Sequence, residues 1–397
     1  MMPKKLLLCC ALIVCFNMFT AGSAAELQPN SAPTTVIMIM LDGFRPDYLT
    51  LYNPPNLMRL MAEGAWVVEG RSVFPSMTTA NQTSFVTGAL PKNTGIPNNS
   101  RYDRALDRII SPLRDNKVPT IAEIVGTQGW ETISINQFML ENRGVLRYFK
   151  GNMSTVSSLL STTKNRILVY YNGETDAVGH TYGPFSSQMR AGVLAADAEI
   201  GRLLEALQQK GLYDKTTIVV ASDHGMSPTD GLPIKPDLIQ LAVQSGIRIA
   251  LDNAYINEDT ELVAYTSGSV YLYWREGKRT PAREAELLAL LRRIDGADIY
   301  TAEDIERLGA DPERLGDIVI VPQAGRSLTL GSGTTGSHGT PQESHSTILF
   351  WGQRIKPGAI VHRASIIDIV PTLLYLLDLE IPATVDGEPL YRIIDKN

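Results

Sequence analysis

The segment "TVIMIMLDG" (residues 35–43) is predicted to be a buried β-strand that ends at an acidic turn. Its nearly continuous run of apolar side chains is typical of a parallel strand covered on both faces. The segment "TTIVVASDHG" (residues 216–225) repeats the pattern and ends at Asp223 and His224. Ligands of open α/β sheets gather at the carboxyl ends of the strands. The two segments therefore predict a functional site at one edge of a sheet.

Two further apolar runs, "RILVYY" (residues 166–171) and "STILFW" (residues 346–351), are also predicted strands of this parallel type. Between the strands lie helical patterns, of which "SSQMRAGVLAADAEIGRLLEALQQKG" (residues 186–211) is the clearest. Strands that alternate with helices favour an α/β fold with a doubly wound, mostly parallel central sheet flanked by helices. The apolar face of the long helix is formed by Met189, Val193, Ala196, Ile200, Leu203, Leu204 and Leu207.

The regular alternation of buried strands and helices is interrupted between residues 232 and 322. This stretch contains the strand-like "SVYLYWREG" and "DIVIVP" and the charged helical pattern "TPAREAELLALLRRIDG". We expect a small inserted α+β subdomain at residues 232–322, within a catalytic domain formed by residues 26–231 and 323–397.

The first 25 residues are predicted to be a secretory signal peptide. Two lysines precede an apolar run at residues 6–19, and small residues follow at positions 21–25. The run is short for a membrane-spanning helix, so we expect a secreted or periplasmic protein without a stable membrane span. This segment holds every cysteine of the chain: Cys9, Cys10 and Cys15. The mature protein would therefore contain no cysteine, which excludes cysteine-based catalysis and cysteine–zinc sites.

The overall composition is that of an ordinary globular protein. Hydrophobic residues make up 44% of the chain, and the formal net charge is −6. A mildly acidic chain offers no basic surface, so we expect no nucleic-acid binding by bulk electrostatics. The composition leaves the oligomeric state open.

Four separate segments bring aspartate or histidine to the predicted edge. For any one of these residues, a turn or a structural hydrogen bond is the simpler explanation. Carboxylate oxygens and neutral imidazole nitrogens together suit zinc or a similar divalent ion, and their convergence predicts a metal site of unspecified stoichiometry. The candidate ligands are Asp42, Asp176, His180, Asp223, His224 and His338.

The segment "RSVFPSMTTANQTSFVTGALP" (residues 71–91) holds the candidate nucleophiles. If a helix begins within it, the first N–H groups and the helix dipole form an anion site. A hydroxyl bound to a metal there would ionise and attack phosphorus or sulfur. The residues alone do not decide between Ser76, Thr78, Thr79, Thr83 and Ser84.

Five motifs together resemble the nucleotide pyrophosphatase/phosphodiesterases of the alkaline phosphatase superfamily. They are "LDGFRPDYL", "FPSMTTANQTSFVTGALPKNTGIPNN", "YYNGETDAVGHTYGP", "SDHGM" and "GSHGT", and they span residues 42–338 in the family's order. The resemblance implies an alkaline phosphatase-like hydrolase with two zinc ions, although manganese or iron remains an alternative. Its substrate would be a small phosphate ester or a nucleotide, cleaved at a phosphodiester or pyrophosphate bond.

The resemblance also assigns roles to individual residues. The family motif Pro-Ser-x-Thr-Phe-Pro-Asn aligns with "PSMTTAN" and makes Thr78 the nucleophile, which would form a phospho-threonine intermediate. Asn99 matches an asparagine that donates a hydrogen bond to a phosphate oxygen. The implied ligands are Asp42, Asp223, His224 and the Thr78 oxygen for one zinc, and Asp176, His180 and His338 for the other.

Two positions bear on the substrate. Thr79 stands where the family has the phenylalanine that helps to hold a nucleotide base, so base recognition is in doubt. Tyr171 matches a tyrosine of the pocket wall, although a buried strand tyrosine explains it equally well. Both are candidate substrate-binding residues.

Other activities of the superfamily are alternatives. A phosphomonoesterase or a phosphonate hydrolase would make use of His345, or of Lys164 and Arg166 as a phosphate clamp, although a charge pair at a strand edge is the simpler explanation of the last two. A sulfatase is disfavoured because the signature Cys/Ser-x-Pro-x-Arg is absent. An inactive metal-binding protein is the alternative from a different class, and the intact candidate residues argue against it.

Overall fold

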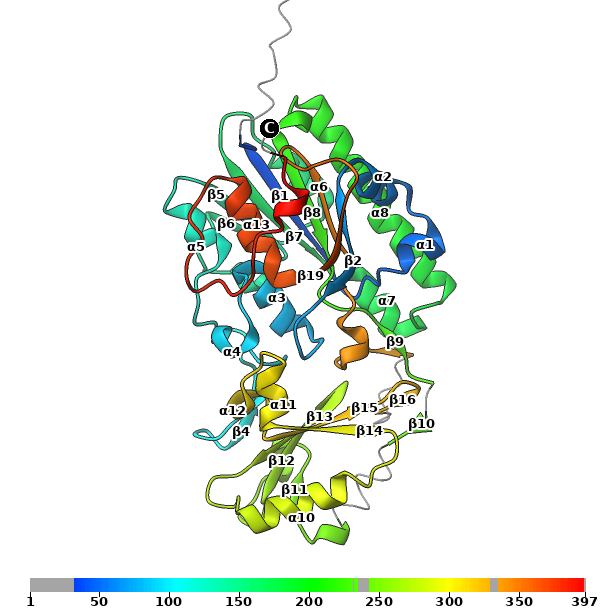
Figure 1. Cartoon of the computed structure of the whole chain (residues 1–397), viewed down its shortest axis with the longest axis vertical. Coiled ribbons are helices and arrows are strands. Elements are labelled where there is room, and N and C mark those ends of the chain that lie inside the picture. The colour runs from blue at the N-terminus through cyan, green and yellow to red at the C-terminus, as the bar shows by residue number, and fades with distance from the viewer. Residues whose placement is uncertain (1–31, 231, 235–242, 329–334, 396–397) are drawn as a thin grey trace, which may run out of the picture. The chain divides into compact units, whose positions relative to one another are not determined.

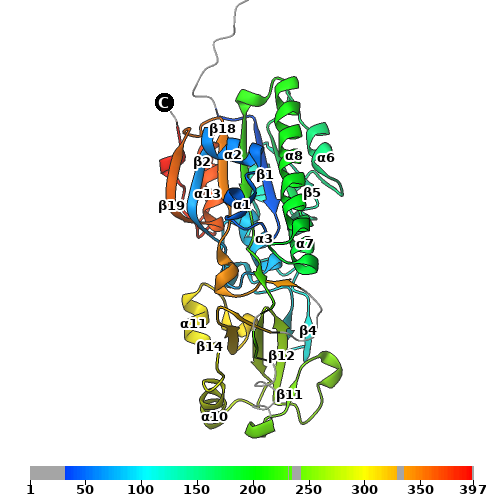
Figure 2. The same ribbon diagram turned by 90° about the vertical axis from the view of Figure 1, so that its right-hand side faces the viewer.

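An eight-stranded sheet forms the centre of the fold (Figure 1). The computed structural model describes residues 32–230, 232–234, 243–328 and 335–395, so the predicted signal peptide lies outside the described residues. Figure 2 shows β19, β2, β18, β1 and β5 in this order across the sheet. The full order is β19 (Ala359–Ser365), β2 (Ala65–Arg71), β18 (Ile348–Gly352), β8 (Thr216–Ala221), β1 (Thr35–Leu41), β7 (Arg166–Asn172), β5 (Glu131–Ile135) and β6 (Arg147–Phe149).

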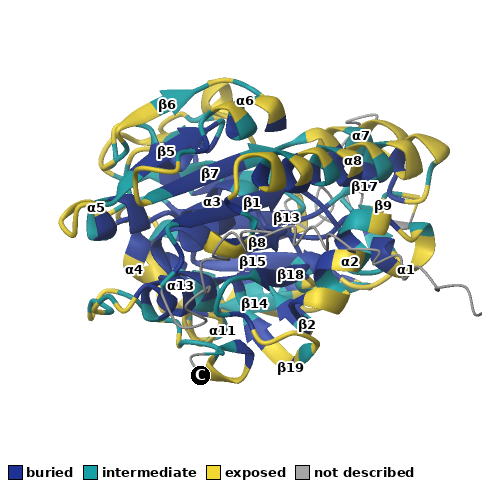
Figure 3. Ribbon diagram, turned by 90° about the horizontal axis from the view of Figure 1, so that it is seen from above, coloured by how far each residue is buried: buried dark blue, intermediate teal, exposed yellow. Residues whose placement is uncertain are grey.

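The predicted mostly parallel sheet is confirmed. β1 pairs in parallel with β7 and with β8, and every residue of β1 and β8 is buried (Figure 3). One direction differs from the expectation, because β18 is antiparallel to both of its neighbours, β8 and β2. A continuous apolar run indicates that a strand is buried on both faces. Because burial does not depend on the direction of the strand, the run could not predict that β18 is antiparallel.

Alternate residues of β1 point into two separate cores. Val36, Met38 and Met40 pack on one side, and Ile37 and Ile39 pack on the other. The first core is covered by α3 (Thr78–Thr87), α5 (Ile121–Gly126) and α13 (Ile369–Leu376). The second is covered by α1 (Tyr48–Tyr52), α2 (Pro55–Glu63), α6 (Met153–Ser158), α7 (Glu174–Tyr182) and α8 (Ser187–Gln209). Figure 1 shows these two layers on opposite sides of the strands.

The long helix α8 confirms its predicted apolar face, since all seven expected positions are buried. Ser186 caps its first turn by accepting a hydrogen bond from the Met189 N–H at 3.0 Å. Asp197 is also buried on this face, and its side chain accepts hydrogen bonds from Leu57 N and Asn56 Nδ2 at 2.8 Å each. This carboxylate satisfies an N–H group in the first turn of α2, a helix whose own N-cap is a proline.

A second sheet of five strands lies within residues 249–322. Antiparallel pairs join β12 to β13, β13 to β15 and β15 to β14, and separate apolar cores cover its two faces. Its strands are β11 (Ile249–Ala250), β12 (Leu262–Ser267), β13 (Ser269–Trp274), β15 (Ile318–Pro322) and β14 (Ala297–Thr301), and its helices are α10 (Pro281–Leu291), α11 (Ala302–Arg307) and α12 (Pro312–Leu315).

Short elements complete the described part of the chain. They are α4 (Pro91–Thr94), β3 (Arg101–Asp103), β4 (Arg108–Ile110), β9 (Ser227–Pro228), β10 (Leu232–Pro233), β16 (Arg326–Ser327) and β17 (Gly336–Ser337). Among the described residues, the structure contains no helix that is both long and apolar enough to cross a membrane.

Candidate metal centre and active site

The predicted ligands meet at the carboxyl edge of the eight-stranded sheet. Asp42 follows β1 directly, and Asp223 and His224 follow β8. Asp176 and His180 lie one turn apart on α7, the helix that begins just after β7. The Asp42 N–H donates to the Asn172 carbonyl at 2.9 Å, which ties the end of β1 to the end of β7. His338 comes from a different part of the chain, immediately after β17.

One cluster consists of Asp42, Asp223 and His224. Their candidate ligand atoms all lie within 4.8 Å of one another, and the three residues are at most 1% exposed. The His224 Nε2 atom lies 3.1 Å from Asp42 Oδ1 and 3.8 Å from Asp223 Oδ1. Burying two carboxylates side by side is unfavourable unless they bind protons or a cation.

The second cluster consists of Asp176, His224 and His338, whose ligand atoms also lie within 4.8 Å of one another. Asp176 Oδ1 lies 3.3 Å from the His180 Nε2 atom and 3.5 Å from the His338 Nε2 atom. The rings of His224 and His338 are stacked, with centroids 3.6 Å apart. His224 therefore belongs to both clusters and lies between the Asp42 and Asp223 carboxylates and the Asp176 carboxylate.

The three clustered histidines are all held in the same tautomer. A carbonyl oxygen only accepts hydrogen bonds, so the Nδ1 atom facing it must carry the proton. This leaves Nε2, the atom that faces the carboxylates, with the lone pair that a metal ion requires. The Nδ1–carbonyl distances are 2.8 Å for His180 to Gly336, His224 to Gly225 and His338 to Ser76.

These contacts fit a divalent cation. Asp42 Oδ1 and Asp176 Oδ1 are buried and make no hydrogen bond, although imidazole Nε2 atoms lie close to both. Two atoms that both present lone pairs at about 3 Å repel each other unless a proton or a cation lies between them. Oxygen and nitrogen donors in this arrangement suit zinc or a related metal.

The pKa values of Asp223 and His224 also indicate that positive charge stabilises this cluster. Burial and the neighbouring Asp42 raise the pKa of Asp223 well above its usual range. Burial alone would lower the pKa of His224, but Asp223 and Asp42 raise it to about 10. Burial and His224 lower the pKa of His338 to about 3. In the metal-free cluster, Asp223 and His224 thus retain protons that a bound metal would replace, whereas His338 is already neutral.

Thr78 is the hydroxyl that faces this cluster. It is the first residue of α3, and its Oγ1 atom lies 3.3 Å from His224 Nε2. Three of the other candidates donate their hydroxyls to backbone carbonyls: Ser76 to Thr340 at 2.7 Å, Thr83 to Thr79 at 2.7 Å and Ser84 to Ala89 at 2.7 Å.

Asn99 lies beside the first turn of α3. Its Oδ1 atom accepts a hydrogen bond from the Thr79 N–H at 2.9 Å, and its own N–H donates to Asn98 Oδ1 at 2.7 Å. With Oδ1 occupied, the half-buried side chain keeps its NH₂ group available as a donor. Thr79 itself is buried, and the position has no aromatic ring.

Tyr171 contacts the metal cluster and also lines a cavity. Its hydroxyl donates to Asp42 Oδ2 at 2.5 Å, and burial together with Asp42 raises its pKa far above the usual range. Its ring contacts Phe138 edge-on, with centroids 5.5 Å apart. Both rings line a cavity of about 450 Å³ together with Tyr148 and Lys150.

Sequence reasoning missed the residues that hold the ligands. The Gln82 side-chain amide donates to Asp223 Oδ2 at 2.8 Å, and Gln137 donates to Gln82 at 2.5 Å. The Thr175 hydroxyl donates to the Asp42 carbonyl. Gln82 is four residues after Thr78 and so shares its helix face, a spacing that could have revealed it.

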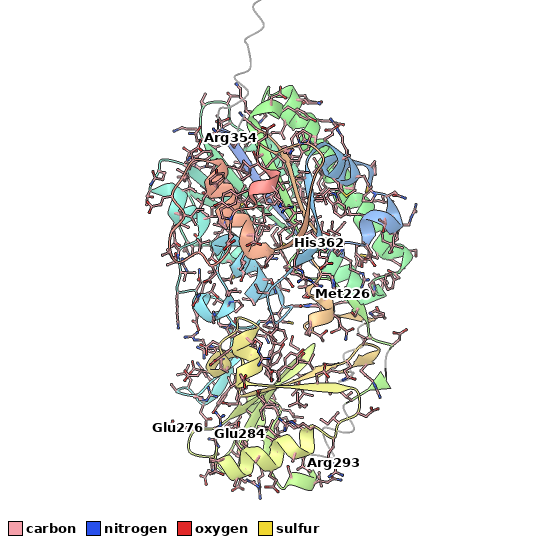
Figure 4. The ribbon with its side chains drawn as sticks, viewed as in Figure 1. Met226, Glu276, Glu284, Arg293, Arg354 and His362 are labelled. Atoms are coloured by element: carbon pink, nitrogen blue, oxygen red, sulfur yellow. The ribbon has the colours of Figure 1, made fainter. Side chains whose placement is uncertain are left out.

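The residues considered for a monoesterase lie elsewhere. Lys164 and Arg166 pair with Glu131, at 3.3 and 2.5 Å, at the start of β7 and thus at the end of the strand opposite the ligands. His345 lines a separate cavity of about 250 Å³ with Arg45 and Glu343. The remaining histidine, His362, is exposed on β19 (Figure 4).

The sequence model of the type I phosphodiesterase / nucleotide pyrophosphatase family matches residues 36–136 and 137–346. The chain belongs to this family. The expected resemblance is therefore confirmed, as is the expectation of a hydrolase of the phosphodiesterase/nucleotide pyrophosphatase type.

Several known proteins have related sequences. The bis(5'-adenosyl)-triphosphatase enpp4 of Mus musculus is 25% identical over 391 residues, covering 90% of this chain and 80% of the relative. The human ENPP4 is 29% identical over 240 residues, covering 54% of this chain and 52% of the relative. A venom phosphodiesterase of Macrovipera lebetinus is 27% identical over 232 residues, 52% of this chain and 27% of the relative. The matched region thus spans about half of the human protein and less of the venom enzyme.

Solved structures share the fold. Murine ectonucleotide pyrophosphatase / phosphodiesterase 5 superposes with a TM-score of 0.70 and 22% identity, covering 87% of this chain and 96% of that chain. The alkaline phosphatase PafA superposes with a TM-score of 0.74 and 16% identity, covering 92% and 99%. The predicted alkaline phosphatase-like fold is confirmed.

Proposed function

We propose that this protein hydrolyses phosphodiester or pyrophosphate bonds of small substrates by way of a phospho-threonine at Thr78. One observation carries the proposal. Among the predicted hydroxyls, Thr78 is the one whose oxygen lies against a buried Asp–His cluster, 3.3 Å from His224 Nε2. It also begins a ten-residue helix, and the positive end of the helix dipole attracts a phosphate.

The metal assignment is the one that the family resemblance implies, and the two clusters support it, although the second cluster groups Asp176 with His224 and His338 and His180 joins it through Asp176. Asp42, Asp223 and His224 would hold one zinc ion, with the Thr78 oxygen as a further ligand, and Asp176, His180 and His338 would hold the second. Manganese or iron would suit the same donors less well than zinc. A bound metal of this kind polarises a phosphoryl oxygen as a Lewis acid.

The chain's own residues supply the remaining chemistry. The Thr78 hydroxyl gives up its proton to solvent as its oxygen attacks phosphorus, and the leaving oxygen departs with the bonding electrons and takes up a proton from solvent. Water later attacks the phosphorus of the phospho-threonine, which releases the phosphate product and restores the hydroxyl. The Asn99 NH₂ group would donate to a non-bridging oxygen, where negative charge grows in the transition state. The hydrogen bond from Thr79 fixes the amide in the orientation that this donation requires.

A nucleotide is the best-supported substrate class. Relatives are named as bis(5'-adenosyl)-triphosphatases, and an inactive variant of murine ENPP5 has a structure in complex with AMP. The cavity beside Tyr171 offers the rings of Phe138 and Tyr148 and the ammonium group of Lys150. Aromatic faces and a cation suit a base and an additional phosphate. Thr79 and Tyr171 would border this substrate.

The same proposal includes location and domain organisation. Residues 1–25 would direct the protein to the periplasm or the exterior as a cleaved signal peptide. Residues 26–231 and 323–397 would form the catalytic domain, with residues 232–322 as the inserted subdomain. The core on one face of the five-stranded sheet supports this division, because its buried members all lie within residues 234–320, whereas the core on the other face also contains Phe74 and Tyr102.

The deciding experiment compares the kcat/KM of the zinc-loaded protein for bis-p-nitrophenyl phosphate and for p-nitrophenyl phosphate. A strong preference for the diester is expected. A strong preference for the monoester would instead assign the protein to the phosphatases of the superfamily. Two bound metals with activity on neither substrate would contradict the proposed hydrolysis and favour an inactive metal-binding protein.

A further inference from the structure

The five-stranded sheet reaches the metal centre through one hairpin. Ser267 and Ser269 pair across the end of β12 and β13, which leaves Gly268 as the residue at the tip. A Cβ atom on Gly268 would lie 1.8 Å from the carbonyl oxygen of His338 and 2.8 Å from the Gly339 Cα atom. These distances are far below any normal contact, and the obstructing atoms are backbone atoms that have no rotamer to change.

Gly339, the residue after His338, is also tightly packed. A Cβ atom on Gly339 would lie 2.9 Å from Met77 Sδ and 2.9 Å from the Ser267 carbonyl oxygen. The Ser269 hydroxyl donates to the Gly339 carbonyl at 3.3 Å. The backbone at residues 338–339 is thus held between the hairpin tip and Met77, the residue that precedes Thr78.

Hydrogen bonds on the other side complete this clamp. The His338 Nδ1–H donates to the Ser76 carbonyl at 2.8 Å, and the Ser76 hydroxyl donates to the Thr340 carbonyl at 2.7 Å. The segment that carries His338 is therefore fixed against the segment that carries Thr78. The hairpin tip closes the remaining side, where Gly268 lies against the His338 carbonyl and Ser269 bonds to the Gly339 carbonyl.

We propose that Gly268 is a positioning residue for the metal centre. By allowing the hairpin to approach the His338 backbone, it sets the place of the imidazole whose Nε2 faces Asp176 beside His224. The inference rests on the proposed role of His338 as a metal ligand. Through Gly268, the five-stranded sheet helps to hold the metal centre in place.

The first test compares Gly268→Ala with Gly277→Ala in the full protein. Both glycines have left-handed φ angles, +68° and +73°, so alanine carries a similar backbone cost at each. Only Gly268 has backbone atoms in the way, whereas Gly277 has no heavy atom within 4 Å of a Cβ position. It follows Glu276, which Figure 4 shows far from Met226, a residue two positions after His224.

The measurement is zinc binding, by chelator competition and by elemental analysis of the purified protein. We expect Gly268→Ala to weaken one zinc site by about 10- to 100-fold, the usual effect of disturbing a residue that orients a ligand. Gly277→Ala should bind both ions as the wild type does. Wild-type zinc binding by Gly268→Ala would overturn the proposal.

A double variant separates positioning from general damage. In the His338→Ala background, Gly268→Ala should cause no further loss of zinc affinity or of kcat, because the residue it positions is gone. A further loss of the same size would show that Gly268 acts elsewhere and would overturn the proposal. If His338→Ala alone retained both ions, the ligand assignment, and with it the proposed function as stated, would fail independently of Gly268.

If Gly268→Ala does not fold, the variant Ser269→Ala tests the same contact between the hairpin and the His338 segment. It removes the hydroxyl donated to Gly339 without introducing a collision. The same zinc site should weaken about threefold, in line with a single hydrogen bond of about 0.5–1 kcal/mol. Unchanged zinc binding by this variant would also overturn the proposal.

Discussion

The Thr79 N–H donates to the Asn99 side-chain oxygen at 2.9 Å, which joins the first turn of α3 to the loop that ends at Asn99. The bond has two consequences for a substrate. It occupies the backbone donor that directly follows Thr78, and it leaves the NH₂ group of the Asn99 amide able to donate to a substrate. The proposed phosphate contact therefore belongs to the Asn99 side chain.

Replacing Asn99 tests this contact. Asn99→Ala removes the donor and should lower kcat by about 10²- to 10³-fold with a smaller change in KM. Asn99→Asp keeps an acceptor for the Thr79 N–H but places a negative charge beside the phosphate, so it should be at least as damaging. Steady-state kinetics of both variants would check this, and an unchanged kcat in Asn99→Ala would show that the side chain does not face the substrate.

Thr78→Ala should abolish turnover while leaving the fold and both metal sites largely intact. The hydroxyl is the proposed nucleophile, and its removal leaves every Asp and His of the clusters in place. Zinc content, thermal unfolding and kcat would be measured together. The matched control is Thr127→Ala, which deletes an exposed hydroxyl bonded only to the Ile124 carbonyl. Persistent turnover in Thr78→Ala would point to direct attack by water.

Buried strands and the convergence of Asp and His were predictable because both depend on local patterns. The strands β1, β7 and β8 are short apolar runs, and Asp42, Asp176, Asp223 and His224 follow the ends of these strands within four residues. The direction of β18 was not predictable, since its residues are buried on both faces whichever way it runs.

Contacts between segments that are far apart in the chain could not be predicted from the sequence either. Gly268 precedes His338 by 70 residues and lies in an ordinary-looking turn, so nothing local marks its approach to the metal centre. The hydroxyls were not distinguishable from the residues alone, and it was the resemblance to the family that selected Thr78. The structure adds that the Ser76 and Thr83 hydroxyls donate to backbone carbonyls.

Gln82 should prove important for metal binding although it is no ligand. Its amide donates to Asp223 Oδ2 in a fully buried environment, and Gln137 holds it in place. Gln82→Ala should weaken zinc binding by about 10- to 100-fold, as expected for a group that orients a ligand. Chelator competition would measure this, with Gln128→Ala, at an exposed position, as the control. Equal zinc affinity in Gln82→Ala and the control would contradict the assignment.

Two substitutions separate the roles of the Tyr171 hydroxyl and ring. Tyr171→Phe removes the hydrogen bond to Asp42 but keeps the ring beside Phe138, so zinc affinity should fall while KM for a nucleotide stays similar. Tyr171→Ala also removes the cavity wall and should raise KM. Metal titration and steady-state kinetics on one nucleotide substrate would check both. An unchanged KM in Tyr171→Ala would remove Tyr171 from the proposed substrate pocket.

Removing the metal should destabilise the protein as well as inactivate it. Asp42 and Asp223 are almost fully buried and lie beside each other, so loss of the cation leaves their like charges to be neutralised by protons alone. A ligand present at a thousand times its dissociation constant stabilises a fold by about 4 kcal/mol, so a chelator should lower the midpoint of thermal unfolding by several degrees. Asp42→Asn removes one of the two charges, and the chelator should therefore shift its midpoint less than that of the wild type. A wild-type midpoint that does not respond to a chelator, while activity disappears, would show that the metal serves catalysis without stabilising the buried carboxylates.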